Sequence, residues 1–420
     1  MRTLAYAALW LFVFSVPWEN SIVVPGIGVS SRFTGMLAVG TTLAAVVVAG
    51  RIRRWHLVHV TALMFVIWAG CVLWVNSNEP TLPQKFWTYP QLFLVLWMIW
   101  ELAPSRQRQL GLLVAYVLGA WVTAVQTIIA FRMHGGAMRR FSTGAADPNA
   151  VAMTLALAVP MAWYLGIIYR QPLLRWICRG YLPVGLLALA LTASRGGLLA
   201  AIVGLLIVPL TMTSLTPARL ATAIALVSLS GALAVAYVPD AIVQRFATTR
   251  SSVEDLSLGG RFEVWKAGMH AFAYRPLAGY GAGAFKRATS PWLGGLERVA
   301  HNSFVSILVE QGIIGFLLYS MIFVVVFLAL LNLPPLERRY ALVLFATTGM
   351  TMLPLTWEDS KPVWFILGAL VGLSQAQGTR TGGAVPRPRA TAPLQGPPRG
   401  IRPRPPLTAP VRHAGPDAPA

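Results

Sequence analysis

The sequence predicts an all-α, polytopic integral membrane protein with about twelve transmembrane helices and a long outward-facing loop between the ninth and the tenth. Three observations lead to this fold class. Of the 420 residues, 56% are hydrophobic and only 11% are charged, whereas soluble chains carry roughly 25% charged residues. Apolar runs recur along most of the chain, and basic residues gather in alternate loops between them. A water-soluble globular protein is excluded, and two cysteines, Cys71 and Cys178, make no disulfide framework.

The expected spans coincide with a series of apolar runs, each near the length that a bilayer crossing requires. These runs are 4–17, 33–50, 57–75, 87–103, 110–131, 150–169, 181–194, 197–213, 219–237, 303–331, 340–357 and 361–375. The first run follows Met1 and Arg2 and resembles the core of a signal peptide. Because no small-residue cleavage site follows it, we expect this run to be retained as a span.

The orientation follows from the short loops, since cytoplasmic loops carry an excess of Lys and Arg. Short loops after even-numbered spans carry the following basic residues: Arg51, Arg53, Arg54, Arg106, Arg108, Arg170, Arg175, Arg179, Arg219, Arg338 and Arg339. Both termini are therefore expected in the cytoplasm. We expect a membrane domain over residues 1–375 and a disordered, Pro/Arg-rich cytoplasmic tail over 376–420. Much of the net charge of +20 lies in these loops and the tail, which favours membrane lipids as partners and no nucleic acid.

The odd-numbered loops then face outward, and two of them, 132–149 and 238–302, are long. They carry many basic residues: Arg132, Arg139, Arg140, Arg245, Arg250, Arg261, Lys266, Arg275, Lys286, Arg287 and Arg298. Long loops translocate largely regardless of charge, and single residues can contact lipid headgroups. As a cluster, these residues favour an anionic partner at the outer face.

Arg195 lies at the middle of the apolar segment 182–210. Two full crossings need about 40 residues, so this segment predicts a short hairpin with its tip at or below the outer interface. Gly196 and Gly197 would permit a tight reversal, because glycine tolerates positive φ angles. A charge within the membrane costs about 2.5–3.5 kcal/mol and normally has a partner. Arg195 can therefore snorkel, pair with an acid or bind an anion.

Residues 260–272 have the periodicity of a helix lying in the membrane interface. One face carries Phe262, Trp265, Met269 and Phe272, whereas Arg261 lies off that face. Such a helix would hold Arg261 at the depth of lipid phosphates. Pro276 ends the helix, and glycines alternate from Gly279 to Gly283. Without a strand–helix context we interpret this run as a turn rather than a phosphate cradle.

His301 precedes the tenth span, where Asn302 or Ser303 can cap the helix. The helix dipole and the neighbouring arginines disfavour the imidazolium, and a neutral imidazole can act as a general base. His134 and His270 also face outward, and the residue pattern alone does not rank the three histidines. Glu310 lies about 13 Å deeper, so we expect it to be a structural charge partner. Glu310 and Asp147 are the acids considered as partners of Arg195.

These segments, in this order, resemble the O-antigen ligase/polymerase superfamily of bacterial envelope glycosyltransferases. The matching stretches are Gly144–Asn149, Leu191–Gly197, Gly260 and Arg261 with Trp265, Arg275–Gly281, Ala300–Ser303 and Glu310–Gly315. The resemblance extends over residues 130–330 by motif and over the whole chain by topology.

The resemblance implies a GT-C-like, metal-independent transferase of the bacterial inner membrane that needs no cofactor and has a periplasmic active site. Its donor would be a glycan on undecaprenyl diphosphate, and its acceptor a sugar hydroxyl of lipid A-core. Carried onto this chain, Arg195 and Arg261 would hold the diphosphate and His301 would deprotonate the acceptor. The supporting residues would be Asn302, Glu310, Asp147 and Arg139.

The residue types suit this chemistry. Guanidinium groups stabilise the charge that develops on a diphosphate leaving group, and direct attack by a hydroxyl predicts inversion at the anomeric carbon. No Asp/Glu cluster is evident on the outer side, which is consistent with a reaction that needs no bridging metal ion. A polymerase of O-antigen or exopolysaccharide shares the motifs and stays an alternative. A transporter of lipid-linked sugars is a further alternative, although it would favour internal repeats and charges near the middle of the bilayer.

Overall fold

A computed structural model describes residues 1–24, 28–76, 82–134, 140–143, 146–212, 216–247 and 260–381. Each of the predicted apolar runs falls on a helix, the eighth on the consecutive pair α9 and α10. These helices are α1 (Arg2–Ser15), α2 (Ser30–Ala49), α3 (Leu57–Val75), α5 (Thr88–Leu102), α6 (Arg106–His134), α7 (Pro148–Ile168), α8 (Pro172–Leu191), α9 (Arg195–Leu205), α10 (Ile207–Met212), α11 (Pro217–Tyr237), α16 (Ser303–Leu330), α17 (Pro335–Met352) and α18 (Lys361–Thr381).

Seven helices in the described part of the chain are long and apolar enough to cross a membrane. They are α2, α3, α6, α7, α8, residues Leu220–Tyr237 of α11, and α16. Two shorter apolar stretches, Arg195–Thr211 and Lys361–Ala376, correspond to α9–α10 and to most of α18. The protein is therefore a multi-pass membrane protein of the all-α class, and the crossing of all twelve predicted spans stays a prediction.

Short elements connect the long helices: η1 (Val16–Ser21), β1 (Val23–Val24), β2 (Gly28–Val29), α4 (Leu82–Phe86), α12 (Asp240–Ala247), α14 (Arg261–Tyr274), α15 (Phe285–Thr289) and η3 (Ser290–Leu293). The two strands pair antiparallel, with Val23 opposite Val29, and are a minor exception to the all-α prediction. The segment expected as one long loop contains α12, α14, α15 and η3, and α14 confirms the helix predicted over 260–272.

Helix α7 lies at the centre of the long helices and packs against α6, α8, α9 and α17. Its close contact with α9 depends on two glycines. A Cβ atom on Gly197 would lie 2.4 Å from the Cβ of Ala152, and one on Gly196 would lie 2.8 Å from Cε of Met153. Both glycines belong to helix α9, so the prediction that they reverse the chain through positive φ is wrong. Ala193 has that conformation instead, with φ +53°.

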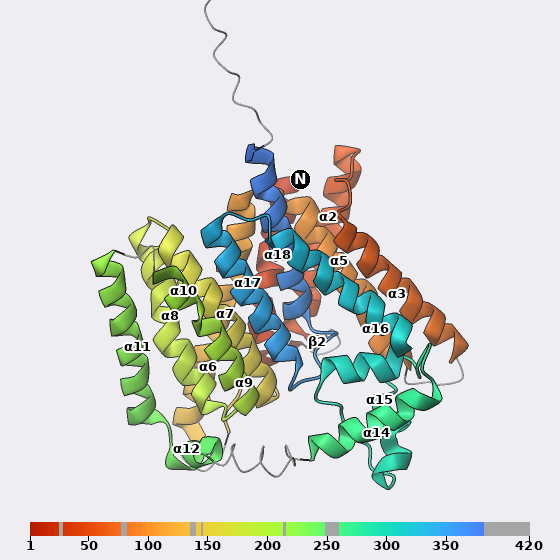
Figure 1. The fold of residues 1–420 in the computed structure, drawn as a ribbon. Helices are drawn as coiled ribbons and strands as arrows, with labels where there is room; N and C mark the ends of the chain where they lie inside the picture. The colour runs from red at the N-terminus through yellow and green to blue at the C-terminus, as the bar shows by residue number, and fades with distance from the viewer. Residues whose placement is uncertain are drawn as a thin grey trace, which may run out of the picture. The chain divides into compact units, whose positions relative to one another are not determined.

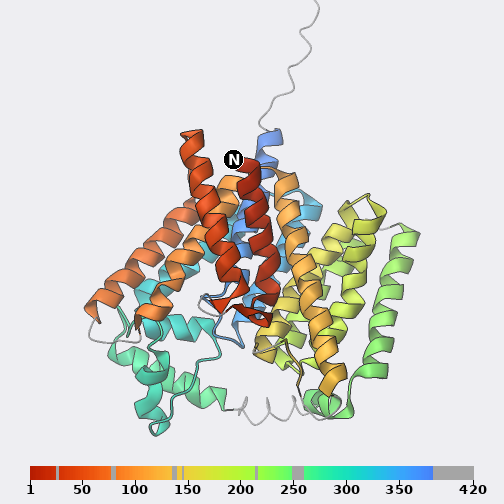
Figure 2. The ribbon, with the colours of Figure 1, turned by 180° about the vertical axis from the view of Figure 1, so that it is seen from behind.

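The N-terminus and the end of α18 lie at one end of the long helices, and α12, α14 and α15 lie at the other (Figures 1 and 2). At the end with the N-terminus, basic residues meet carboxylates. Arg2 pairs with Glu101 at 2.9 Å, and Arg106 pairs with Glu337 at 3.0 Å. Helix α18 continues to Thr381, past the predicted boundary at 375, and the rest of the predicted tail lies outside the described residues.

Helix α16 is broken at Gly312, which has φ +64° and ψ −172°. The loop after α14 supplies the missing hydrogen bonds: Tyr280 N donates to Val309 O at 3.1 Å, and Gly281 N donates to Glu310 O at 2.7 Å. On the other side of the break, Ile313 N donates to the carbonyl oxygen of Pro276 at 2.8 Å. Backbone groups within a membrane helix must be satisfied internally, so the break fixes the loop against α16.

The two segments meet at contact distance, which requires glycine on both sides. A Cβ atom on Gly312 would lie 2.2 Å from Leu277 O, and one on Gly279 would lie 2.5 Å from Val309 O. Gly279, Gly281 and Gly283 all have positive φ. The alternating glycines therefore form a turn, as predicted. Within this turn, the amides of Tyr280 and Gly281 donate hydrogen bonds to α16.

Candidate active site

Arg261 and His301 line one cavity of about 370 Å³. The rest of the lining consists of Gly260, Val264, Lys286, Glu297, Arg298 and Val299. Three cationic side chains thus face a single carboxylate, that of Glu297. A cavity with this excess of positive charge favours an anionic ligand.

Arg261 is positioned by α14, of which it is the first residue. Gly260 precedes the helix with φ +80°, and Val264, Ala267 and Ala271 form the buried face of α14, which packs against α16. The indole Nε1 of Trp265 donates to Ala300 O at 2.8 Å. This bond ties the helix that carries Arg261 to the residue that precedes His301.

His301 has φ +47°, a left-handed conformation that only Ala193 shares among the described non-glycine residues. Such conformations persist where the surrounding structure enforces them, and they are common at functional sites. Here the conformation is held by hydrogen bonds of the next two residues, Asn302 and Ser303. Asn302 caps α16, since its Oδ1 accepts from Phe304 N at 3.0 Å and from Val305 N at 3.1 Å, and Ser303 Oγ donates to Leu355 O at 3.0 Å.

The site lowers the pKa of the His301 imidazole below its usual value. Burial is the main cause, and the positive charge of Arg261 adds to it, whereas Asp147 acts in the opposite direction. The pKa of Arg261 is lowered by burial and by Arg195, and Asp147 again opposes the shift. Arg195 and Asp147 thus act electrostatically on Arg261, and Arg261 and Asp147 act on His301.

Arg195 is the first residue of α9 and does not line the cavity of about 370 Å³. The turn that carries it is joined to the start of α7. Ser194 Oγ accepts from Gly197 N at 3.2 Å and donates to Asn149 Oδ1 at 3.0 Å, and Asp147 caps α7 by accepting from Asn149 N at 2.6 Å. Two of the sequence motifs thus form one structural unit.

Glu310 pairs with Lys85 instead of Arg195. Lys85 Nζ lies 2.8 Å from Glu310 Oε2 and 2.6 Å from Glu358 Oε1, and both carboxylates are almost fully buried. Glu310 is therefore a structural charge partner, as expected, but with a different cation. The second carboxylate on Lys85, that of Glu358, and its neighbour Asp359 are not among the residues that the sequence singled out.

Arg139 falls outside the described residues. His270 stacks on Trp292 with ring centroids 6.3 Å apart, and His134 is an exposed residue whose Nδ1 lies 2.9 Å from Ala130 O. Neither histidine lines the cavity, so the structure separates them from His301.

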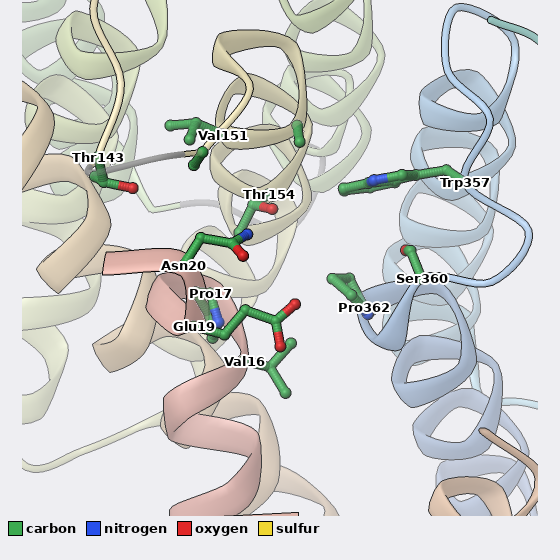
Figure 3. Close-up of a pocket in the computed structure, with 12 residues that line it drawn as sticks. Val16, Pro17, Glu19, Asn20, Thr143, Val151, Thr154, Trp357, Ser360 and Pro362 are labelled. Carbon is green, nitrogen blue, oxygen red and sulfur yellow. The ribbon is translucent and has the colours of Figure 1, made fainter. Parts of the chain in front are cut away.

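A small cavity of about 70 Å³ lies between η1, the start of α7 and the turn into α18. Figure 3 shows Trp357 and Ser360 on one side, facing Asn20 and Thr154 on the other. Ala150, Val151 and Thr154 of α7, a few residues after Asp147, line this cavity. Its volume suffices for a few water molecules.

Residues 180–320 match the family described as Wzy_C, O-Antigen ligase. The matched stretch includes Arg195, Arg261, His301 and Glu310. No curated protein matches the chain.

Proposed function

Because residues 180–320 of this chain belong to the O-antigen ligase/polymerase superfamily, we propose that the protein is an O-antigen ligase. It transfers a glycan from undecaprenyl diphosphate to a sugar hydroxyl of lipid A-core, at the periplasmic face of the bacterial inner membrane. The family relationship supports ligase or related polymerase activity, and the donor, acceptor and location are part of our proposal.

The observation that carries the proposal is the shared cavity of Arg261 and His301. A diphosphate leaving group gathers negative charge as its bond to the sugar breaks. Arg261, Lys286 and Arg298 would stabilise that charge through charge-assisted hydrogen bonds, and Arg195, whose positive charge acts on Arg261, would add to this stabilisation. Arg195 and Arg261 are the first residues of helices α9 and α14, and Lys286 belongs to α15.

His301 acts as the general base in this mechanism. Its imidazole takes the proton of the acceptor hydroxyl as the oxygen attacks the anomeric carbon. The glycosidic bond forms, the bond from that carbon to the diphosphate breaks, and the diphosphate departs with the electron pair. Direct displacement gives inversion. The carboxylates of Glu310 and Glu358 are engaged by Lys85, which supports a mechanism without a bridging metal ion.

The proposed reaction is tested with purified protein and a lipid-linked glycan donor. One arm offers lipid A-core as the acceptor, and the other offers a second lipid-linked glycan. Glycosylated lipid A-core is the expected product. Elongation of the lipid-linked glycan alone would assign the protein as a polymerase, and movement of donor across liposomes without any new bond would make it a transporter.

His301→Ala should lower transfer by about 10²–10⁴-fold, the usual contribution of a positioned base. His270→Ala is the matched control, because this histidine lies outside the cavity and should keep wild-type activity. Both variants should elute and melt like the wild type. Undiminished transfer by His301→Ala would remove His301 as the base.

A further inference from the structure

A second cavity, of about 560 Å³, adjoins the cavity of Arg261 and His301. It is lined by Gln84, Lys85, Gly283, Ala284, Lys286, Arg287, Glu297 and Asp359. Lys286 and Glu297 line both cavities, so the two share a wall. The volume lies within the range of about 300–1,000 Å³ that is typical of small-molecule sites.

The lining of this second cavity is assembled from distant parts of the chain. Gln84 and Lys85 come from α4, Lys286 and Arg287 from α15, and Asp359 from the turn between α17 and α18. Lys85 is held by Glu310 and Glu358, which fixes α4 against α16 and against that turn. The convergence of these fixed segments gives the cavity a defined set of polar groups.

The two cavities differ in their charge. Around the cavity of Arg261 and His301, Arg261, Lys286 and Arg298 face the single carboxylate of Glu297. In the second cavity, Lys286 and Arg287 are matched by Glu297 and Asp359, the charge of Lys85 is neutralised by its two buried carboxylates, and Gln84 adds an amide.

Balanced charges select for a ligand that both donates and accepts hydrogen bonds. An anion would meet the carboxylates of Glu297 and Asp359, and an apolar group would form no hydrogen bond with the polar side chains that line the cavity. Sugar hydroxyls can bond to the carboxylates, the amide and the cations alike. The chemistry of the second cavity therefore matches a saccharide without charged substituents.

We propose that the second cavity binds the terminal saccharide of the acceptor through its hydroxyl groups, with Gln84, Arg287 and Asp359 as its recognition residues. This inference rests on the proposed transfer reaction. It places the acceptor sugar beside the wall of Lys286 and Glu297, with His301, Arg261 and Arg298 in the adjoining cavity.

The test measures saccharide binding and transfer separately. The probe is the delipidated core oligosaccharide of the host cell, dephosphorylated by hydrofluoric acid, and its binding to the protein in nanodiscs is measured by calorimetry. Gln84→Ala and Arg287→Ala should each weaken binding by roughly 3–10-fold, the effect of losing one hydrogen bond, and raise the acceptor KM accordingly. Arg298→Ala is the matched variant on the other cavity and should raise the donor KM while leaving oligosaccharide binding unchanged.

Each outcome decides between the two proposals. Wild-type protein that binds the oligosaccharide in a Gln84-dependent manner but transfers nothing would contradict the proposed function and keep the saccharide site. Wild-type protein that transfers glycan while the Gln84 and Arg287 variants bind normally would overturn the saccharide site and keep the function. The site is also overturned if the probe does not bind, or if binding requires the phosphate groups of the native oligosaccharide.

Discussion

The protonation state of His301 depends on burial and on two charged neighbours of opposite sign. Burial and Arg261 lower the pKa of the imidazole, and Asp147 raises it. The net lowering keeps the imidazole neutral to a more acidic pH than an ordinary histidine, whose pKa is about 6.5. Only the neutral form can take the proton of the acceptor, so activity should persist below the pH at which an unperturbed histidine becomes charged.

The two neighbours should move the pH dependence of transfer in opposite directions. Arg261→Ala removes a positive charge, which raises the pKa of His301 and moves the acidic limb of the kcat/KM profile to higher pH. Asp147→Asn removes a negative charge, which lowers that pKa and moves the limb to lower pH. Asparagine is as good a helix cap as aspartate, so the second variant keeps the start of α7.

Profiles of kcat/KM against pH for the wild type and both variants provide the measurement. The position of the limb is read independently of the overall rate, which Arg261→Ala should also reduce through weaker donor binding. Limbs that coincide in all three proteins would show that a group other than His301 controls the acidic side of the profile.

At the scale of elements, the break in α16 couples the helix to the segment that carries Arg261. The amides of Tyr280 and Gly281 bond to carbonyls before the break, and the carbonyl oxygen of Pro276 accepts from Ile313 after it. The loop after α14 is thus held by the same helix whose first turn follows His301. Arg261 and His301 reach one cavity because both segments are fixed to α16.

Gly312→Ala should disrupt this docking. The new Cβ atom would lie 2.2 Å from Leu277 O, in a backbone conformation with positive φ, and the expected loss is about 1–3 kcal/mol. Gly349→Ala is the control, since no atom lies within 4 Å of the added Cβ and alanine favours a helix by up to about 1 kcal/mol. The melting temperature in detergent and the transfer activity should both fall for Gly312→Ala, and neither should fall for Gly349→Ala. Equal melting temperatures of the two variants would contradict the proposed role of the break in holding the loop.

Lys85 links α4, α16 and the turn into α18 through two buried carboxylates. Lys85→Met would leave both carboxylates without their cation, and removal of one partner of a buried pair costs about 3–5 kcal/mol. Lys266→Met, at an exposed position of α14, should leave the melting temperature unchanged. The triple variant that combines Lys85→Met with Glu310→Gln and Glu358→Gln should recover part of the loss, and a triple variant no more stable than the single one would show that charge pairing is not the cause.

At the scale of the whole molecule, the sequence was sufficient to locate the helices along the chain. It was insufficient to predict which side chains of different helices contact one another. Helix positions follow from local hydrophobicity, and each predicted apolar run coincides with a helix. The pairing of Lys85 with Glu310 joins residues 225 positions apart, and nothing local distinguishes Lys85 from other basic residues near the end of a span. The role of Gly197 was missed for the same reason, because its packing against Ala152 is a contact between helices.

The candidate site was predicted only in part. Residue type, position at a helix start and family resemblance predict Arg261 and His301, and the structure brings both to one cavity. The second cavity could not be predicted, since its wall combines α4, α15 and the turn before α18. In the sequence, Lys85 is a single lysine before an apolar run, and Glu358 and Asp359 are an acidic pair between two spans. Only the fold shows that Lys85 and Asp359 line the same cavity.

The membrane orientation is the property on which the location of both cavities depends. The N-terminus and the end of α18 lie at one end of the helices, opposite α14 and α15 (Figure 1), and the excess of basic loop residues predicts that the first of these ends is cytoplasmic. Single cysteines placed at Ile52 and Leu296, which are 58% and 55% exposed, in a chain without Cys71 and Cys178, should therefore react differently with a membrane-impermeant thiol reagent. In cells with a permeabilised outer membrane, the cysteine at 296 should be labelled at once and that at 52 only after the inner membrane is lysed. The opposite pattern would place the cavities of Arg261 and Gln84 in the cytoplasm, where a periplasmic acceptor could not reach them.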